Sequence, residues 1–241
     1  MITRPHEEAK VLEKEFLKNG KKSTIDSLIH FRFQFKKIAF DKNILYLISS
    51  PQAVKVISKY KKKYSQLLIE GKFIVVGKKV AAELKKIAPL NIIKVTKDSK
   101  DMTTFLLSQR QSKNNYKKIA FISGTIFNKE FVQNLRKNEI EIKRKIIYTT
   151  LSKKNFAKNT VKLFNQRKIS YVVLFSNYTA KVFLKLIKLK NLQDKVSNIP
   201  VVSISKRVDT ILKREHLFKQ TFVSKKPNQK SLIDKIIVLS K

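Results

Sequence analysis

The chain has no cysteine among its 241 residues. A disulfide framework and thiolate chemistry are therefore excluded, although this alone does not diagnose the cellular compartment. Glycine occurs four times and proline five times, and no flexible linker or low-complexity tail stands out. No apolar run approaches the roughly 18 to 20 residues that cross a bilayer, and the start, MITRPHEEAK, lacks the apolar core of a signal peptide. We expect a soluble, cytoplasmic protein with no membrane segment.

Acidic residues are scarce, with 17 Asp+Glu against 54 Lys+Arg and a net charge of +37. Such a field concentrates anionic partners, whether nucleic acid, an acidic membrane surface or a polycarboxylate. The chain is also rich in Ile, Asn, Phe and Tyr, which share A/T-rich codons with Lys, so mutational drift is a competing explanation. Charge alone names no ligand.

Two classes of site lack their sequence signals. His6, His30 and His216 are scattered without the spacing of metal ligands, so no metal site is predicted. A Gly-rich phosphate loop is also missing, which argues against a nucleotide enzyme.

The run KYKKKY at 59–64 interleaves aromatic and basic residues, as single-strand nucleic-acid binders can. Tyr60 and Tyr64 nevertheless continue the spacing of Ala53 and Ile57, which is one face of a helix. We therefore interpret the lysines as the solvated face of a helix whose tyrosines are buried.

Apolar runs alternate with helical patterns along the chain, which predicts an α/β fold with parallel sheets. Two segments, 30–36 and 140–149, instead show two-residue alternation, and we interpret them as exposed extended strands that can pair with each other. The other predicted strands are 1–4, 44–49, 72–76, 91–96, 117–123, 169–176, 200–205 and 220–224.

The strand predicted at 44–49 stops at the sequence SSP. Ser50 fits a helix N-cap and Pro51 the first helical position. Helix starts of this kind bind anions, because free N–H groups and the positive end of the helix dipole coincide. Simple capping is the alternative reading.

Internal repeats strengthen the anion-binding reading. Three segments recur in the same order at offsets of 120, 127 and 128, which suggests related halves at 1–118 and 119–241. Strand–helix junctions at Ser50 and Gly77 then correspond to junctions at Ser176 and Ser205, at the strand ends where α/β sheets bind ligands. The segments 2–20, 46–57 and 76–86 match 122–140, 173–184 and 204–214.

Together these segments resemble the uroporphyrinogen-III synthase family. ITRP looks like its T-R-P strand end, LISSPQAV is similar to T-S-P-x-A-V, and FIVVGKKVAAEL resembles V-G-x-x-T-A-x-x-L. FISGTIFNKEFVQNLRKNEIEIKRKIIYTT matches a strand, Gly124, a helix and a Y-x-T strand, and VVLFSNYTAKVF resembles F-T-S-x-x-A-x-x-F. The ordered set covers essentially the whole chain.

The resemblance implies two similar parallel-sheet α/β domains joined by a two-stranded connection, with one domain discontinuous. On this sequence, one domain would combine 1–29 with 151–241, the other would span 37–144, and 30–36 and 145–150 would connect them.

The resemblance also implies an activity. The family cyclises hydroxymethylbilane, a small-molecule polycarboxylate, to uroporphyrinogen III with loss of water and inversion of ring D, and needs no metal or organic cofactor. A monomer without membrane or nucleic-acid partners would follow. The rival from another class is a basic nucleic-acid-binding protein without catalysis, and a substrate-binding relative without turnover is a third possibility.

Site residues follow from the same resemblance. Tyr148 matches the tyrosine proposed to protonate the departing hydroxyl, although a strand tyrosine can simply pack. Ser50 and Ser176 match serines at helix starts, where capping is the alternative. The remaining expected substrate contacts are Thr3, Arg4, Gly77, Lys78, Gly124, Ser205 and Lys206.

The chain departs from the family pattern where threonine is usual. Val80 and Val208 stand at those positions, so hydroxyl contacts to substrate are lost there. The neighbouring cations could supply charge instead, and decayed activity is one possible consequence. Those cations are Lys78, Lys79, Lys206 and Arg207.

Overall fold

The structure is a computed structural model that describes residues 1–109 and 118–240. Lys117, the first residue of the strand predicted at 117–123, lies outside the described residues, as do the corresponding parts of the predicted domains. The chain divides into two compact units. We call Phe31–Thr150 the internal unit, and Met1–His30 with Leu151–Lys241 the terminal unit.

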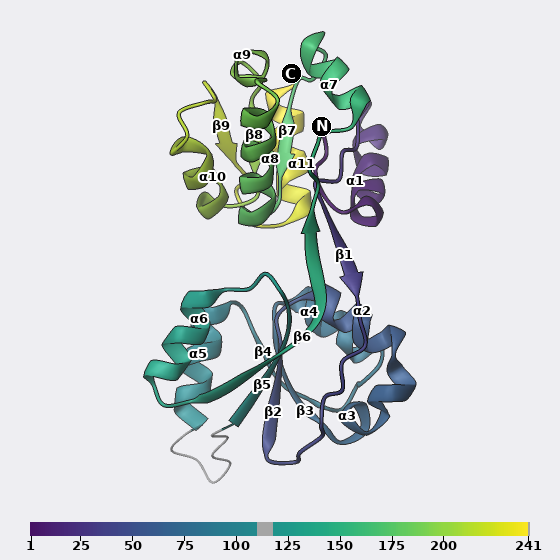
Figure 1. Ribbon diagram of the computed structural model, residues 1–241, viewed down its shortest axis with the longest axis vertical. Coiled ribbons are helices and arrows are strands. Elements are labelled where there is room, and N and C mark those ends of the chain that lie inside the picture. Colours follow the sequence, from purple (N-terminus) through teal and green to yellow (C-terminus); the bar gives the residue numbers. More distant parts are fainter. Residues whose placement is uncertain (110–117, 241) are drawn as a thin grey trace. The chain divides into compact units, whose positions relative to one another are not determined.

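The internal unit is built on a largely parallel sheet with the strand order β1-β6-β5-β2-β3-β4 (Figure 1). All neighbours from β6 to β4 run parallel. The strands are β1 (Ile29–Phe33), β2 (Ile44–Ile48), β3 (Lys72–Val76), β4 (Ile92–Thr96), β5 (Lys118–Gly124) and β6 (Glu141–Ser152).

Helices cover both faces of this sheet because its central strands are apolar on both sides. Tyr46 and Ile48 of β2 enter one core, and Leu45 and Leu47 enter the other. The first core is closed by α2 (Pro51–Lys59), α3 (Ser65–Glu70) and α4 (Lys78–Lys85), and the second by α5 (Ser99–Ser108) and α6 (Lys129–Lys137).

The prediction of one helix that carries Ala53, Ile57, Tyr60 and Tyr64 on a single face is wrong in its second half. The α2 helix ends at Lys59, and a 3₁₀ turn, η1 (Lys61–Tyr64), follows. Tyr64 is nevertheless buried, and its hydroxyl donates to the Lys36 carbonyl (2.8 Å), whereas Tyr60 is only half-buried. The three lysines of the turn are exposed, as the solvated-face interpretation requires.

The prediction of an exposed strand at 140–149 is also wrong for much of its length. The first part of β6 pairs in parallel with β5, and Ile142 and Ile147 are buried. Ile142 packs into the core that α5 and α6 close, and Ile147 packs into the core on the other face, so both faces of β6 are partly covered.

The expected pairing of the two alternating segments is confirmed, since β1 neighbours β6. Gln34 N–H donates to the Ile147 carbonyl (3.2 Å), and Lys153 N–H donates to the Leu28 carbonyl (2.9 Å). Residue numbers rise along β1 as those of its partners in β6 fall, so β1 and β6 are antiparallel.

The terminal unit has a parallel sheet with the order β7 (Val172–Leu174), β8 (Val201–Ser203) and β9 (Thr221–Val223). Ile2 extends it through parallel bridges to Val173 and Ile25. The prediction of a strand at 1–4 is therefore wrong, because only the two isolated bridges of Ile2 form there. Ile2 nevertheless occupies a strand position in the sheet, beside β7.

Helices again flank the sheet of the terminal unit (Figure 1). On one face, α1 (His6–Lys18) and α11 (Gln229–Leu239) share a core with Ile2, Val173 and Val202. The remaining helices are α7 (Lys158–Asn165), α8 (Asn177–Leu189), α9 (Gln193–Val196) and α10 (Lys206–Lys213), of which α8 and α10 pack together.

The two sheets follow one plan. In the internal unit, β6, β5, β2, β3 and β4 lie in that order; in the terminal unit, Ile25, Ile2, β7, β8 and β9 do. The repeat in the sequence matches this correspondence, since residues 2 and 122 align, as do 46 and 173. The α/β class with parallel sheets is confirmed.

Candidate active site

A topological switch point lies in the sheet of the internal unit, between β2 and β5. These strands are neighbours, but the chain proceeds from β2 toward β3 and from β5 toward β6, in opposite directions across the sheet. The helices that follow them, α2 and α6, accordingly pack on opposite faces. Ligands of open α/β sheets bind in the crevice outside such a point, at the carboxyl ends of the strands. Ser50 follows β2 at this place, and Gly124 ends β5.

Ser50 has extended backbone angles and is the N-cap of α2, as predicted. Its Oγ accepts the Gln52 N–H (3.2 Å), and Pro51 occupies the first turn. The Ala53 N–H donates to the Ser50 carbonyl (3.1 Å), and Pro51 has no N–H. These first three positions of α2 therefore offer a ligand the positive end of the helix dipole and no spare backbone donor.

Tyr148 lies at the same switch point. Its hydroxyl donates to Ser50 Oγ at 2.9 Å, joining two residues that are 98 positions apart. Only 4% of Tyr148 is exposed. Burial raises the pKa of the phenol above its ordinary value, and the hydrogen bond with Ser50 opposes that rise. The phenol therefore carries its proton throughout the neutral range.

Gly124 makes room for the Tyr148 ring. The two residues are register partners across β5 and β6. A Cβ at Gly124 would lie 2.2 Å from Tyr148 Cε2 and 2.4 Å from Cζ, far inside van der Waals contact. The ring of Phe31 meets the ring of Tyr148 edge-on, with centroids 5.7 Å apart. Backbone and ring together fix the phenol against Ser50.

Arg144 braces the end of β5. It donates to the Gly124 carbonyl (2.8 Å), and its guanidinium lies 3.4 Å from the centroid of Phe127. Burial lowers its pKa from the usual value, but a guanidinium remains charged at any physiological pH. Sequence reasoning missed this residue, because a single arginine in the alternating run IEIKRKII carries no signal of its own.

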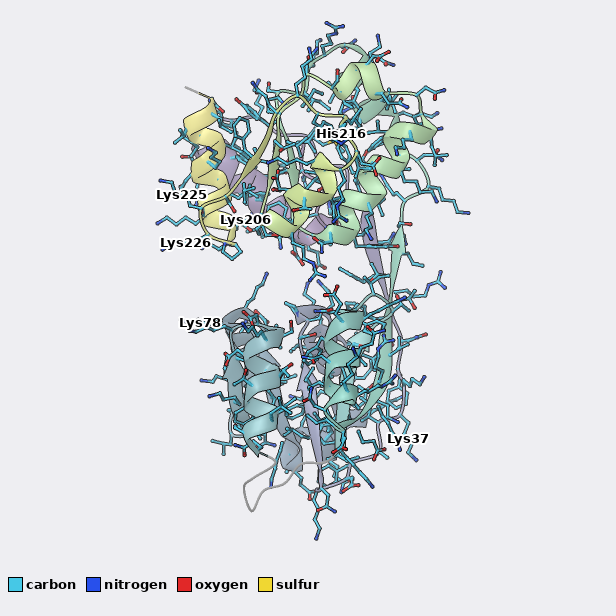
Figure 2. The ribbon with its side chains drawn as sticks, turned by 90° about the vertical axis from the view of Figure 1, so that its left-hand side faces the viewer. Lys37, Lys78, Lys206, His216, Lys225 and Lys226 are labelled. Atoms are coloured by element: carbon cyan, nitrogen blue, oxygen red, sulfur yellow. The ribbon has the colours of Figure 1, made fainter. Side chains whose placement is uncertain are left out.

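Of the residues at the start of α4, Lys78 is exposed to a ligand, whereas the Gly77 N–H is already used and Val80 is buried. Gly77 has φ +90°, which favours glycine, but its N–H is already donated to the Thr96 carbonyl (2.8 Å). Lys78 is exposed at the first helical position and points away from the helix in Figure 2. Val80 is buried in the core.

The terminal unit has the equivalent switch point, between the Ile2 bridge and β7. Ser176 follows β7 and is the N-cap of α8, with its Oγ accepting the Thr179 N–H (3.0 Å). Its partner across the switch point is Arg4, which aligns with Gly124 in the repeat. Each unit thus has a capping serine on one side of its switch point and a residue of the aligned pair on the other: Ser50 and Gly124 in the internal unit, and Ser176 and Arg4 in the terminal unit.

Thr3 and Arg4 make their contacts within the terminal unit. Thr3 is fully buried, and its hydroxyl donates to the Val173 carbonyl (2.7 Å). Arg4 pairs with Glu8 and donates to Gln229 Oε1 (3.0 Å). Its guanidinium also lies 4.4 Å from the ring centroid of Phe175.

Lysines gather where β8 and β9 of the terminal unit end. Lys206 begins α10 after β8, and Lys225 and Lys226 follow β9; Figure 2 labels all three. Ser205 is the N-cap position of α10 but makes no side-chain capping bond. Lys225 and Lys226 were missed, although a basic pair directly after a predicted strand was a usable signal.

The start of α10 already carries an acid. Asp209 is buried in the first turn and pairs with Lys213 (2.9 Å), while its Oδ1 has no hydrogen-bond partner among the described residues. An acid in the first turn suits the helix dipole and weakens the pull of this start on another anion. Val208, like Val80, is buried.

A cavity of about 760 Å³ lies elsewhere in the terminal unit, at the amino ends of its strands. Ile2, Phe16, Tyr171 and Ile236 contribute to its walls, and none of the predicted site residues does. The lysines on its rim follow the carboxyl ends of helices, whose negative dipole ends they complement. We place the site at the switch points instead.

Residues 1–109 and 118–240 contain no helix that is long and apolar enough to cross a membrane. The same residues hold no group of three or more histidines and acids that could bind a metal ion.

Fold and site define a class: a protein of two related α/β units, each with a capped helix start at a topological switch point. A family model described as uroporphyrinogen-III synthase HemD matches residues 10–234. The chain therefore belongs to the uroporphyrinogen-III synthase family, whose members are cyclising lyases that act on a small-molecule tetrapyrrole without a cofactor.

Solved structures of this family have the same fold. The uroporphyrinogen-III synthetase of Helicobacter pylori 26695 is 16% identical with a TM-score of 0.62, covering 91% of this chain and 93% of that one. A mutant uroporphyrinogen III synthase of the extremely thermophilic bacterium Thermus thermophilus is 12% identical with a TM-score of 0.61, covering 100% and 98%. No protein of curated function matches the sequence significantly. The predicted family and two-domain α/β class are confirmed.

Proposed function

We propose that this chain converts hydroxymethylbilane to uroporphyrinogen III, with Tyr148 supplying the proton that lets the terminal hydroxyl leave. Its place in the family supports the reaction. The observation that carries the residue assignment is the 2.9 Å hydrogen bond from Tyr148 to Ser50 at the switch point of the internal unit. A buried phenol with a raised pKa keeps its proton until the reaction needs it.

The reaction divides into two tasks for the protein. Loss of hydroxide leaves an azafulvenium cation, which the ring D pyrrole attacks at its substituted carbon to give a spiro intermediate that reopens and closes again. Proton donation assists the first step, and holding the rings in place favours inversion over simple closure. Proton donation and orientation each contribute on the order of several kcal/mol, as such effects do in other enzymes.

Carboxylate binding is assigned to the helix starts. Ser50 and Ser176 cap α2 and α8, and the positive dipole ends of these two helices suit carboxylates of the substrate. Exposed cations at neighbouring strand ends add charge. In this proposal those cations are Lys78, Lys206, Lys225 and Lys226. Gly77, whose N–H is donated to the Thr96 carbonyl, and Ser205 position the starts of α4 and α10.

Two of the expected contacts have a narrower role in the proposal. Thr3 holds the chain to β7 through its buried hydroxyl, and Gly124 accommodates the Tyr148 ring, so both position other residues. Arg4 contacts a substrate carboxylate only in exchange for its bond to Glu8.

The same proposal extends to organisation. We take residues 1–29 with 151–241 and residues 37–144 as the enzyme's two domains, connected by 30–36 and 145–150. A free small-molecule substrate supports a monomer working in the cytoplasm, which light scattering and cell fractionation would test.

The test is incubation with enzymatically generated hydroxymethylbilane, followed by oxidation and chromatographic separation of the porphyrin isomers. Type III product is expected. Type I alone, the product of spontaneous closure, would refute the proposed function.

A further inference from the structure

We propose that Ser50 is the group that delivers the proton to the departing hydroxyl, with Tyr148 as the internal source behind it. The inference rests on the proposed function and changes the order of donors within it. Ser50 is then a catalytic residue, and α2 is capped by the same oxygen that takes part in the chemistry.

The first argument is a count of protons at Ser50 Oγ. This oxygen accepts the Tyr148 O–H (2.9 Å) and the Gln52 N–H (3.2 Å). A serine hydroxyl has two acceptor lone pairs and one proton. Both lone pairs are therefore used, and among the described residues Ser50 donates its own proton to none. That proton remains for a ligand.

The second argument is the state of the phenol. Tyr148 has one hydroxyl proton, and it is already donated to Ser50. A substrate that took this proton directly would first have to break that hydrogen bond inside a buried site. The ring cannot easily turn toward a ligand, because it lies against the Gly124 backbone and the edge of Phe31.

The third argument is exposure. Tyr148 is 4% exposed, whereas Ser50 is half-buried and Ser49 before it is exposed. Of the two residues, Ser50 is the more exposed and therefore the more accessible to a ligand at the switch point. The phenol lies one hydrogen bond further in.

The environment of Ser50 favours a relay. The oxygen sits at the positive end of α2, a helix of nine residues, and accepts a backbone N–H. Partial negative charge that develops on Oγ during transfer is stabilised by both. The phenol behind it is protonated at neutral pH, because burial raises its pKa.

The proton movements balance. The carbon–oxygen bond of the hydroxymethyl group breaks, the pyrrole nitrogen supplies the electron pair that forms the azafulvenium, and the leaving oxygen takes the Ser50 proton to become water. Ser50 takes the Tyr148 proton in the same step. When the macrocycle closes, the attacked pyrrole carbon loses its proton, which returns through Ser50 to the phenolate. Water leaves and the protein is unchanged.

The experiment compares four single variants, the double variant Ser50→Ala with Tyr148→Phe, and a control in single-turnover assays that measure hydroxymethylbilane consumption and isomer yield. Ser50→Ala removes cap and proton, Ser50→Asn keeps a good cap without a hydroxyl, and Ser50→Thr keeps both. Tyr148→Phe removes the source. Asn128→Ala, which deletes the cap of α6 in the same unit, is the control for losing a cap.

The relay predicts that Ala and Asn at position 50 slow the reaction about as much as Tyr148→Phe, on the order of 10²- to 10⁴-fold. Ser50→Thr should stay within about tenfold of wild type, Asn128→Ala should not change the rate, and Ser50→Ala with Tyr148→Phe should be no slower than either alone. In mixtures of light and heavy water, the wild-type rate constant plotted against the deuterium fraction should give a curve, because two protons move in the same step.

The relay is overturned if Ser50→Ala and Ser50→Asn keep wild-type rates while Tyr148→Phe is slow, if Ser50→Thr is as slow as Ser50→Ala, or if the double variant is multiplicatively slower. Failure of the proposed function is seen separately, because wild type would then give only type I product.

Discussion

At the scale of single residues, the proposed site centres on the phenol of Tyr148 and the atoms that contact it. Ser50 Oγ accepts the hydrogen bond from the Tyr148 hydroxyl, the Gly124 backbone lies against the Tyr148 ring, and the Phe31 ring meets the Tyr148 ring edge-on. Because these contacts come from different strands, a change in any of them should act on Tyr148.

Replacing Tyr148 with Phe should lower the rate of type III formation by about 10²- to 10⁴-fold, the usual contribution of a general acid. The ring and its packing are kept, so the thermal unfolding midpoint should change little. Rate and circular dichroism melts together make the measurement. A wild-type rate in the folded variant would remove Tyr148 from the mechanism.

The pH profile should have no alkaline limb from Tyr148 until above about pH 10. The proposed mechanism needs the protonated phenol, and burial raises the pKa of Tyr148 above the ordinary value of about 10. Activity that depends on it is thus fully present below that value and is lost as pH rises through the raised pKa. The limb should vanish in Tyr148→Phe; a limb near neutral pH that Tyr148→Phe abolishes would contradict the assignment.

Gly124→Ala should both destabilise the internal unit, by about 1–3 kcal/mol, and slow the reaction. Its Cβ would fall 2.2 Å from Tyr148 Cε2, so the ring must leave Ser50. Gly20→Ala is the control, since its Cβ meets nothing within 4 Å and its strain comes only from φ +68°. Urea unfolding and turnover should separate them: both lose stability, and only Gly124→Ala loses rate.

At the scale of elements, the helix starts differ although the repeat relates them. Ser50 and Ser176 make capping bonds, Ser205 makes none, and Gly77 has no side chain to make one. A cap bond depends on the rotamer that the neighbouring strand end allows, and the residue type alone does not decide it.

Ser176→Ala should therefore cost about 1 kcal/mol of unfolding free energy, the typical loss of a helix cap. Ser205→Ala should cost nearly nothing by this route, because the Ser205 side chain makes no capping bond. Urea titrations of the two variants provide the comparison. Equal losses would show that capping does not distinguish the two helix starts.

At the scale of the whole molecule, the net charge of +37 has two competing explanations. If the field captures the polyanionic substrate, KM should rise steeply between low and physiological salt while kcat stays constant, because screening shortens the reach of surface charge. Steady-state kinetics at several potassium chloride concentrations test this. A KM that does not depend on salt favours compositional drift.

Much of the fold was predictable because it depends on local patterns. The buried run at 44–48 and the SSP that follows it specify a strand, a cap and a helix start, and each forms as expected. Segments that pair with residues far away in the sequence were harder to predict. Residues 1–4 form only the bridges of Ile2, and 140–149 pairs with β5, although its alternating pattern indicated an exposed strand.

The sequence by itself determined the strand–helix alternation, the capping serines at 50 and 176, the repeat and the family, because hydrophobic period, cap chemistry and motif order are local properties of the chain. Only the tertiary structure decided that Tyr148 donates to Ser50, that Gly124 lies against the Tyr148 ring, and that the buried Thr3 hydroxyl donates to the Val173 carbonyl. Those contacts join residues up to 170 positions apart. Strand order brings them together, and no local pattern encodes which distant side chain a hydroxyl will meet.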